Sequence, residues 1–197
     1  MLHRILQTAV LIAIFGCTAA VSAPVYGVPP GPIGGEAGTT IGWGFSITND
    51  TGFYLLVDSS QFCQIGQDPN FTTCTQTQGT YNDLIASDLT VINPNSTLTQ
   101  SYDLSAPSGL GSYTINAGAP LFAIDTGVIV LTYIEFSGNP LTTGTPVSGD
   151  IELGLNDLPN GGSSGAAQVE VTPEPGSFVL LGLGLAGSAM IRRARHR

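Results

Sequence analysis

Apolar and polar side chains alternate, with a period of two residues, through most of the middle of this 197-residue chain. From Ile41 to Thr48, for example, apolar residues alternate with Gly, Ser and Thr. Successive side chains of a β-strand point to opposite faces, so this pattern predicts strands with one buried and one solvated face. The same alternation marks residues 98–104, 151–156 and 167–171. Because no segment between the two ends has a helical apolar period, we expect an all-β fold.

The segment from Val128 to Phe136 is almost continuously apolar or β-branched, which predicts a central strand covered on both faces. Shorter runs at 53–57, 89–92 and 112–115 predict three more strands. The turn sequence from Asn49 to Gly52 predicts a hairpin between the first two strands. About eight short strands separated by turn residues indicate an antiparallel β-sandwich, either immunoglobulin-like or of the jelly-roll type.

Basic residues are confined to the two ends of the chain: none occurs from Ile5 to Ile191, whereas thirteen acidic residues lie between positions 24 and 172. A middle without positive charge cannot neutralise phosphates, which excludes nucleic-acid binding. It also lacks the His of a Ser-His-Asp triad and the Lys of a Schiff base. We therefore expect a protein that is not an enzyme and uses no cofactor. A pair of carboxylates of the glycosidase type needs only Asp and Glu, and it stays a third alternative.

The first residues have the three-part pattern of a secretory signal peptide. His3 and Arg4 precede an apolar run from Ala9 to Phe15, and small residues follow as far as Ala23. We expect a signal peptide over residues 1–23 and, from its Pro and Gly content, a flexible lead-in over residues 24–40. The sandwich domain is then expected over residues 41–172.

The last 25 residues, 173–197, also have three parts. Pro173-Glu174-Pro175 comes first, and an uncharged apolar segment follows over residues 178–191. As a helix this segment would be about 20–25 Å long, a marginal span for a hydrocarbon core of about 30 Å. Positive charge beyond it would hold that end of the helix on the cytoplasmic side. The basic cluster consists of Arg192, Arg193, Arg195 and Arg197. We expect a C-terminal hydrophobic helix that anchors an exported body.

This order of a Pro-Glu-Pro triplet, an apolar helix and an arginine cluster resembles the PEP-CTERM sorting signal of exported bacterial proteins. The resemblance implies recognition by an exosortase, a membrane enzyme thought to remove the tail after transient anchoring in the inner membrane. It also implies a final location at the cell surface or in the extracellular space. Members of this class are commonly associated with extracellular polysaccharide, which makes such a polymer an expected partner.

Cys63 and Cys74 are the only cysteines beyond the signal peptide. In an exported protein such a pair predicts a disulfide. The alternative is a metal or redox site. Ten intervening residues do not match a redox CxxC motif, and no His is available to complete a zinc site, so the structural disulfide is favoured.

Two further sets of residues suggest binding. Trp43 is in phase with the apolar face of its strand and is expected in the core, whereas the tyrosines could form a surface that stacks on sugars. The tyrosines considered are Tyr54, Tyr81, Tyr102, Tyr113 and Tyr133. Loop acids could bind Ca²⁺, although solvated carboxylates are the simpler interpretation. The acidic candidates are Asp50 beside Asn49, Asp150 with Glu152, and Asp157 beside Asn156. We expect a structural or adhesive role, and the alternative is a carbohydrate-binding module that uses the tyrosines with or without calcium.

Overall fold

The computed structural model of the chain describes residues 23–64, 74–86, 89–154, 165–174 and 182–183. The predicted signal peptide and C-terminal helix lie almost wholly outside these residues. The described body is all-β, as predicted, and its strands are β1 (Val25–Gly27), β2 (Pro32–Gly35), β3 (Thr40–Trp43), β4 (Phe45–Asn49), β5 (Tyr54–Gln64), β6 (Gly79–Asp83), β7 (Thr90–Ile92), β8 (Ser96–Gln100), β9 (Gly111–Ile115), β10 (Ile124–Phe136), β11 (Ile151–Leu153) and β12 (Ala166–Val171).

The largest sheet has the strand order β2-β12-β10-β5-β7, and β11 pairs with one end of β10. β10 lies at its centre and pairs with β5 along most of its length. Three consecutive side chains of β10, those of Ile129, Val130 and Leu131, are all buried. Burial of successive residues means that both faces of the strand are covered, which confirms the prediction for this segment.

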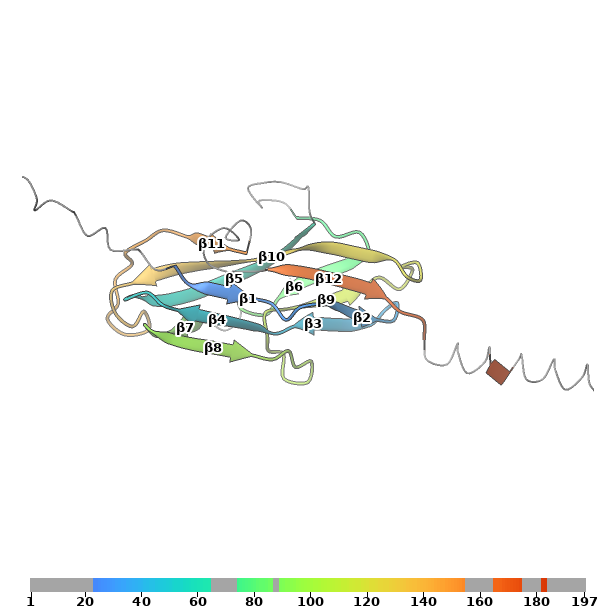
Figure 1. The fold of residues 1–197 in the computed structure, drawn as a ribbon, viewed down its shortest axis with the longest axis horizontal. Helices are drawn as coiled ribbons and strands as arrows, with labels where there is room; N and C mark the ends of the chain where they lie inside the picture. Colours follow the sequence, from blue (N-terminus) through green and yellow to red (C-terminus); the bar gives the residue numbers. More distant parts are fainter. Residues whose placement is uncertain (1–22, 65–73, 87–88, 155–164, 175–181, 184–197) are drawn as a thin grey trace, which may run out of the picture.

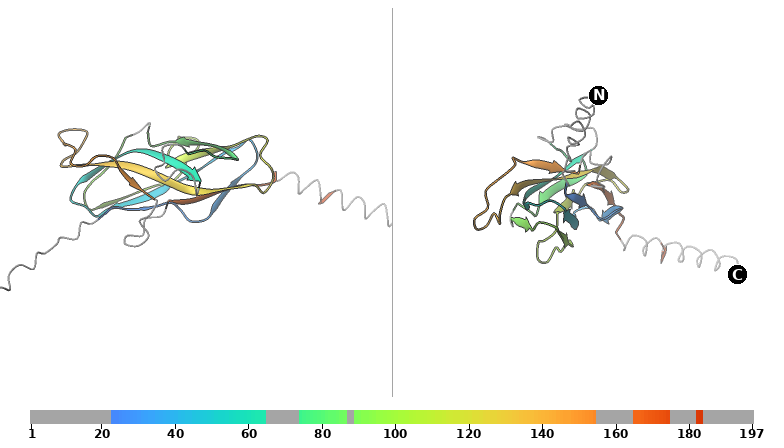
Figure 2. Two further views of the ribbon diagram at one scale, coloured as in Figure 1. Left: turned by 90° about the horizontal axis from the view of Figure 1, so that it is seen from above. Right: turned by 60° about the vertical axis from the view of Figure 1, so that its left-hand side comes forward.

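Two smaller sheets, β1-β4-β8 and β3-β9-β6, lie against the large one (Figures 1 and 2). Their inward side chains meet those of the large sheet in one hydrophobic core. Trp43 of β3 stacks on Phe62 of β5 with 5.8 Å between ring centroids. The hydroxyl of Tyr26, on β1, donates a hydrogen bond to the carbonyl of Ile129 on β10 at 3.2 Å. The layers are therefore joined by packing and by a buried hydrogen bond.

The strand expected from Ile41 to Thr48 is interrupted at Gly44, which separates β3 from β4. The backbone that follows β8 lies directly over this glycine. A Cβ atom at position 44 would lie 2.5 Å from the carbonyl oxygen of Gln100. β8 ends at Gln100, where the chain passes over Gly44. The strand predicted over residues 98–104 therefore stops earlier than expected, and Leu104 is exposed.

The turn from Asn49 to Gly52 is present, but the predicted hairpin is wrong. β4 pairs with β1 and β8, whereas β5 pairs with β10 and β7, so the turn carries the chain from one sheet to another. The buried side chain of Asn49 fixes this turn. Its Nδ2 donates to the carbonyls of Phe53 at 2.8 Å and Asn93 at 3.0 Å, and its Oδ1 accepts from the backbone N–H of Thr51 at 3.0 Å.

The expected flexible lead-in over residues 24–40 is also wrong, because it contains two paired strands. β1 pairs with β4, and β2 pairs with β12 in parallel. The paired body therefore begins before residue 41. The large sheet is mixed, because β2 and β12 are parallel, whereas the two small sheets are purely antiparallel. β6 is a further strand that the sequence did not predict. The choice between an immunoglobulin-like and a jelly-roll sandwich stays a prediction.

Candidate sorting site

The strand that leads into the Pro-Glu-Pro triplet is held on both sides up to its last residue. β12 pairs with β10 on one side and with β2 on the other. Beyond the ladder, the N–H of Thr172 donates to the carbonyl of Gly35 at 2.8 Å. Val171 also forms two hydrogen bonds with the connection before β10. Its carbonyl accepts from the N–H of Phe122 at 2.8 Å, and its N–H donates to the carbonyl of Ala123 at 2.9 Å. Only Thr172 therefore separates the paired strand from the triplet.

Pro173 has no N–H to continue the ladder, so it ends the sheet at this point. Glu174, the next residue, is exposed. The third residue of the triplet, Pro175, and the basic cluster of Arg192, Arg193, Arg195 and Arg197 lie outside the described residues. Pro173 is half-buried and Glu174 exposed, so the first two residues of the predicted sorting motif lie just beyond a paired strand.

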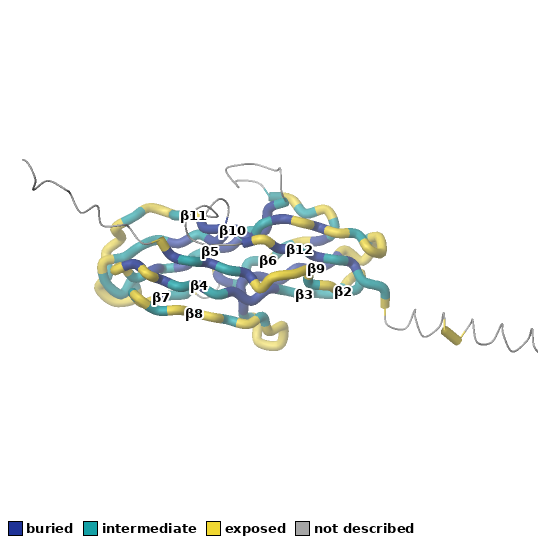
Figure 3. The backbone as a smooth tube through the Cα atoms, in the orientation of Figure 1, coloured by how far each residue is buried: buried dark blue, intermediate teal, exposed yellow. Residues whose placement is uncertain are grey.

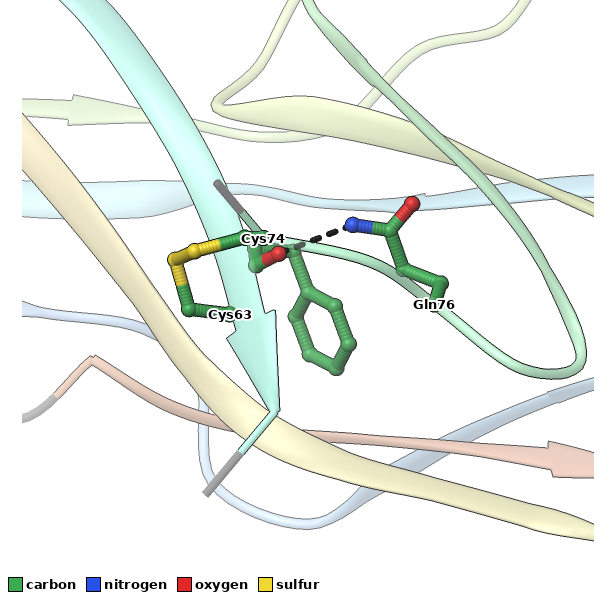
Figure 4. The surroundings of a disulfide bond; sticks show 4 residues. Cys63, Cys74 and Gln76 are labelled. Atoms are coloured by element: carbon green, nitrogen blue, oxygen red, sulfur yellow. Dashed lines mark hydrogen bonds between the residues drawn. A yellow bond between two sulfur atoms is a disulfide. The ribbon is translucent and has the colours of Figure 1, made fainter. Parts of the chain in front are cut away.

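The predicted disulfide between Cys63 and Cys74 is present (Figure 4). The two Cα atoms are 4.7 Å apart, within the usual range for a bridged pair. Cys63 lies near the end of β5, so the bridge fixes residue 74 to the large sheet. The side chain of Gln76 continues this attachment, because its Nε2 donates to the carbonyl of Phe62 at 2.9 Å. The two cysteines are therefore bridged, as predicted.

A buried carboxylate attaches the next residues of the same connection. Asp125 of β10 is fully buried, and its oxygens accept five hydrogen bonds. The backbone N–H groups of Thr77 and Gln78 donate at 3.1 and 2.9 Å, and Nε2 of Gln64 donates at 2.7 Å. The hydroxyls of Thr77 and Tyr113 donate the other two. No signal in the sequence distinguished Asp125 from the other acids.

These bonds determine how the carboxyl group titrates. Burial alone would raise the pKa of Asp125, but the hydrogen bonds from Thr77, Tyr113 and the N–H of Gln78 outweigh burial and hold the pKa below its usual value. Burial and the hydrogen bond to Asp125 both raise the pKa of Tyr113 far above that of a free tyrosine. At neutral pH the pair is a carboxylate with a neutral phenol, an arrangement suited to holding β9, β10 and residues 77–78 together.

Asp83 of β6 occupies a second polar cluster. Its carboxylate accepts from the N–H of Ser60 at 2.9 Å, from the Ser60 hydroxyl at 2.7 Å and from the N–H of Ile85 at 2.8 Å. Burial, followed by the nearby charge of Asp150, raises the pKa of Asp58 on the neighbouring β5. Both oxygens of Asp83 thus accept hydrogen bonds from within the fold.

The predicted tyrosine surface is largely wrong, because most of these side chains belong to the core. Tyr113 and Tyr133 are buried. Tyr81 packs with Trp43 and Phe62, with centroid distances of 6.2 and 6.3 Å. Trp43 is buried, as expected. The period-two pattern predicts the buried face for Trp43, whereas residue type alone does not determine the face on which a tyrosine lies.

Of the remaining tyrosines, Tyr54 and Tyr102 are half-buried. Tyr102 borders a surface groove of about 390 Å³ on the small sheet β1-β4-β8. Its lining combines apolar side chains, such as Val28, Pro29 and Phe45, with the hydroxyls of Ser46 and Thr99. Those two hydroxyls share a hydrogen bond of 3.2 Å across β4 and β8.

The predicted calcium candidates do not form a site in the part of the chain that the structure describes. Asn49 is committed to its own turn, and Asp50, Asp150 and Glu152 are exposed. Asn156 and Asp157 lie outside the described residues. Among the described residues, no three His, Cys, Asp or Glu side chains come close enough together to hold a metal ion.

Comparison with known families identifies the C-terminal segment. Residues 171–195 match the model of the PEP-CTERM protein-sorting motif, which implies exosortase-dependent sorting to the cell surface or extracellular space. No curated protein matches the chain. In the described residues no helix is long and apolar enough to cross a membrane. The matched segment begins at Val171, the last residue of β12.

Proposed function

Because the chain carries a PEP-CTERM sorting motif, we propose that it is an exported, non-enzymatic protein of structural or adhesive type. The C-terminal apolar segment anchors it in the inner membrane until an exosortase acts at the Pro-Glu-Pro triplet. The body then stays at the cell surface or in the surrounding polysaccharide matrix. The observation that carries this proposal is the match over residues 171–195, which begins where the paired strand β12 ends.

The chemistry of the body supports a role without catalysis. It contains no basic side chain from Ile5 to Ile191. Its buried carboxylate, Asp125, is saturated by donors from within the fold. The body has one disulfide and one hydrophobic core shared by its sheets. Its negative charge keeps it soluble and repels anionic surfaces.

Processing is tested by changing the triplet in a host that contains an exosortase. Replacing Pro173, Glu174 and Pro175 with alanine should leave the full-length chain in the membrane fraction, whereas the unchanged chain is released in shortened form. Asp50→Ala is the matched control, because it removes one exposed carboxylate far from the triplet. Release of the triple variant at the normal rate would contradict the proposal.

The structural role is tested by complementation. Cells that lack the chain should lose surface attachment or matrix cohesion. The double variant Asp58→Asn, Asp150→Asn should restore both properties, because a structural module does not need these carboxylates as acid and base. If that variant restores nothing although it is exported and disulfide-bonded, an enzymatic role is favoured instead.

The groove beside Tyr102 supports carbohydrate binding as a second candidate function. Pockets that hold small molecules usually have volumes of about 300–1,000 Å³ and combine apolar walls with a few polar groups. A groove of about 390 Å³ with two hydroxyls meets that description and could receive one or two sugar rings. Binding of matrix polysaccharide that is lost in Tyr102→Ala, but kept in Tyr54→Ala, would support this candidate. Equal binding by both variants would exclude the groove.

A further inference from the structure

The connection between β9 and β10 exposes a compact set of large apolar side chains. Leu121 is 58% exposed and Phe122 is 63% exposed. Ile124, the first residue of β10, is 49% exposed. A soluble surface usually scatters such residues singly, so three of them within four positions indicate a contact surface.

This apolar tip, residues 121–124, lies beside the start of the C-terminal tail. The N–H of Phe122 donates to the carbonyl of Val171 at 2.8 Å, and Pro173 follows two residues later. Figure 1 shows β12 ending at the same right-hand end of the body where β9 connects to β10. Figure 3 shows exposed residues at that end.

The backbone holds the side chain of Phe122 outward. Its φ is +62°, in the left-handed region that a bulky side chain seldom adopts. The hydrogen bond to Val171 fixes the N–H of Phe122, and the N–H of Ala123 donates to the carbonyl of Pro120 at 3.1 Å. Unfavourable backbone conformations persist where the surrounding structure imposes them, and they are common at functional positions.

The length of the tether brings this tip close to a membrane. Five residues, 173–177, separate Thr172 from the apolar segment that begins at Phe178. Even fully extended they span only about 18 Å, at about 3.5 Å per residue. A bilayer is about 40–45 Å thick with its headgroup regions and about 30 Å without them, so part of that tether is used in crossing the headgroups.

The charges around the tip decide which kind of lipid contact is possible. Glu170 pairs with Ile124 across the sheet, and Glu36 and Glu174 lie at the same end. Basic side chains, which bind anionic headgroups, are absent from the sequence between Ile5 and Ile191. Attraction to the membrane surface therefore has to come from apolar side chains rather than from charge.

We propose that Leu121 and Phe122 insert into the interfacial region of the bilayer while the tail is anchored. This inference rests on the proposed anchoring of residues 178–191. The two contacts, one through the tail and one through the tip, fix the orientation of the body. Its opposite end, the connection from β10 to β11, then points away from the membrane. The thirteen residues of β10 separate the two ends by about 40 Å at about 3.3 Å per residue.

The test uses tryptophan as a depth reporter in the full-length chain, reconstituted in zwitterionic vesicles that contain brominated lipid. Phe122→Trp places the reporter in the tip. Leu141→Trp is the matched control, because Leu141 is 65% exposed in the loop at the other end of β10. The natural Trp43 is only 2% exposed and contributes the same background to both variants. Leu121→Trp is a second reporter that leaves position 122 unchanged.

We expect loss of emission from Phe122→Trp and Leu121→Trp in brominated vesicles, with a blue shift, and no loss from Leu141→Trp. If the vesicles retain the chain but neither tip reporter is quenched, or if the control is quenched equally, the inference fails and the proposed anchor stands. If the vesicles do not retain the full-length chain at all, both the anchor and the inference fail.

Discussion

The carboxylate of Asp125 offers the sharpest test of how the body is held together. Asp125→Ala removes the acceptor for the N–H groups of Thr77 and Gln78 and for the hydroxyl of Tyr113. An unsatisfied buried donor costs about 1–3 kcal/mol. Because Thr77 lies at the surface, where water can replace one bond, we expect a total loss of about 3–5 kcal/mol in the free energy of unfolding.

Asp125→Asn should cost less, about 1–2 kcal/mol, because one oxygen still accepts hydrogen bonds. The amide nitrogen can donate to the Thr77 hydroxyl, and the amide of Gln64 can rotate to present its oxygen. Both free energies are measured by urea unfolding of the oxidised chain. Trp43 serves as the fluorescent reporter, since its ring centroid lies 6.2 Å from that of Tyr113. Asp50→Asn is the charge-matched control and should change stability by less than about 0.5 kcal/mol.

The pH dependence of the same variants has a defined sign. The folded pKa of Asp125 lies below the unfolded value, so its stabilising contribution is complete above about pH 4 and is lost as the pH falls through the folded pKa. The stability difference between the native chain and Asp125→Asn should therefore be constant near neutrality and shrink in acid. Equal unfolding midpoints for native chain and Asp125→Ala, or a difference that grows in acid, would refute the reasoning.

Two further changes test the framework of the body. Replacing Cys63 and Cys74 with serine should lower the free energy of unfolding by about 3 kcal/mol, because the bridge joins residues eleven positions apart in the chain. Non-reducing peptide mapping of the native chain should give one linked fragment. Gly44→Ala should lower the free energy of unfolding by about 1–3 kcal/mol, because the new Cβ would meet the carbonyl of Gln100. Gly52→Ala is the control and should be nearly neutral, since no atom outside its chain neighbours lies within 4 Å of its Cβ position. Equal thermal midpoints for these two variants would contradict the account of the strand break.

Sequence reasoning succeeded where the signal is local. The apolar run of β10, the alternation in β12 and the spacing of Cys63 and Cys74 each specify a structure without knowledge of the remaining chain. It failed where pairing depends on distant residues. β2 has a Pro- and Gly-rich sequence that resembles a linker, and it becomes a strand only because β12, more than a hundred residues later, supplies a partner.

The candidate site divides in the same way. The triplet at Pro173 is a linear motif, and linear motifs are visible in sequence. The apolar tip at Leu121 and Phe122 is not, because three apolar residues before a strand are usually core. Only the fold shows that they face solvent beside the tail. Asp125 was one acid among thirteen until the structure placed five donors around it.

The central claim is that the body is cargo delivered to the outside and separated from its tail. Mass spectrometry of the protein recovered from the cell surface or matrix tests it most directly. The account predicts a C-terminal peptide that ends within residues 173–177, with nothing from Phe178 onward. Surface material that still carries residues 178–197, in cells with an active exosortase, would contradict it.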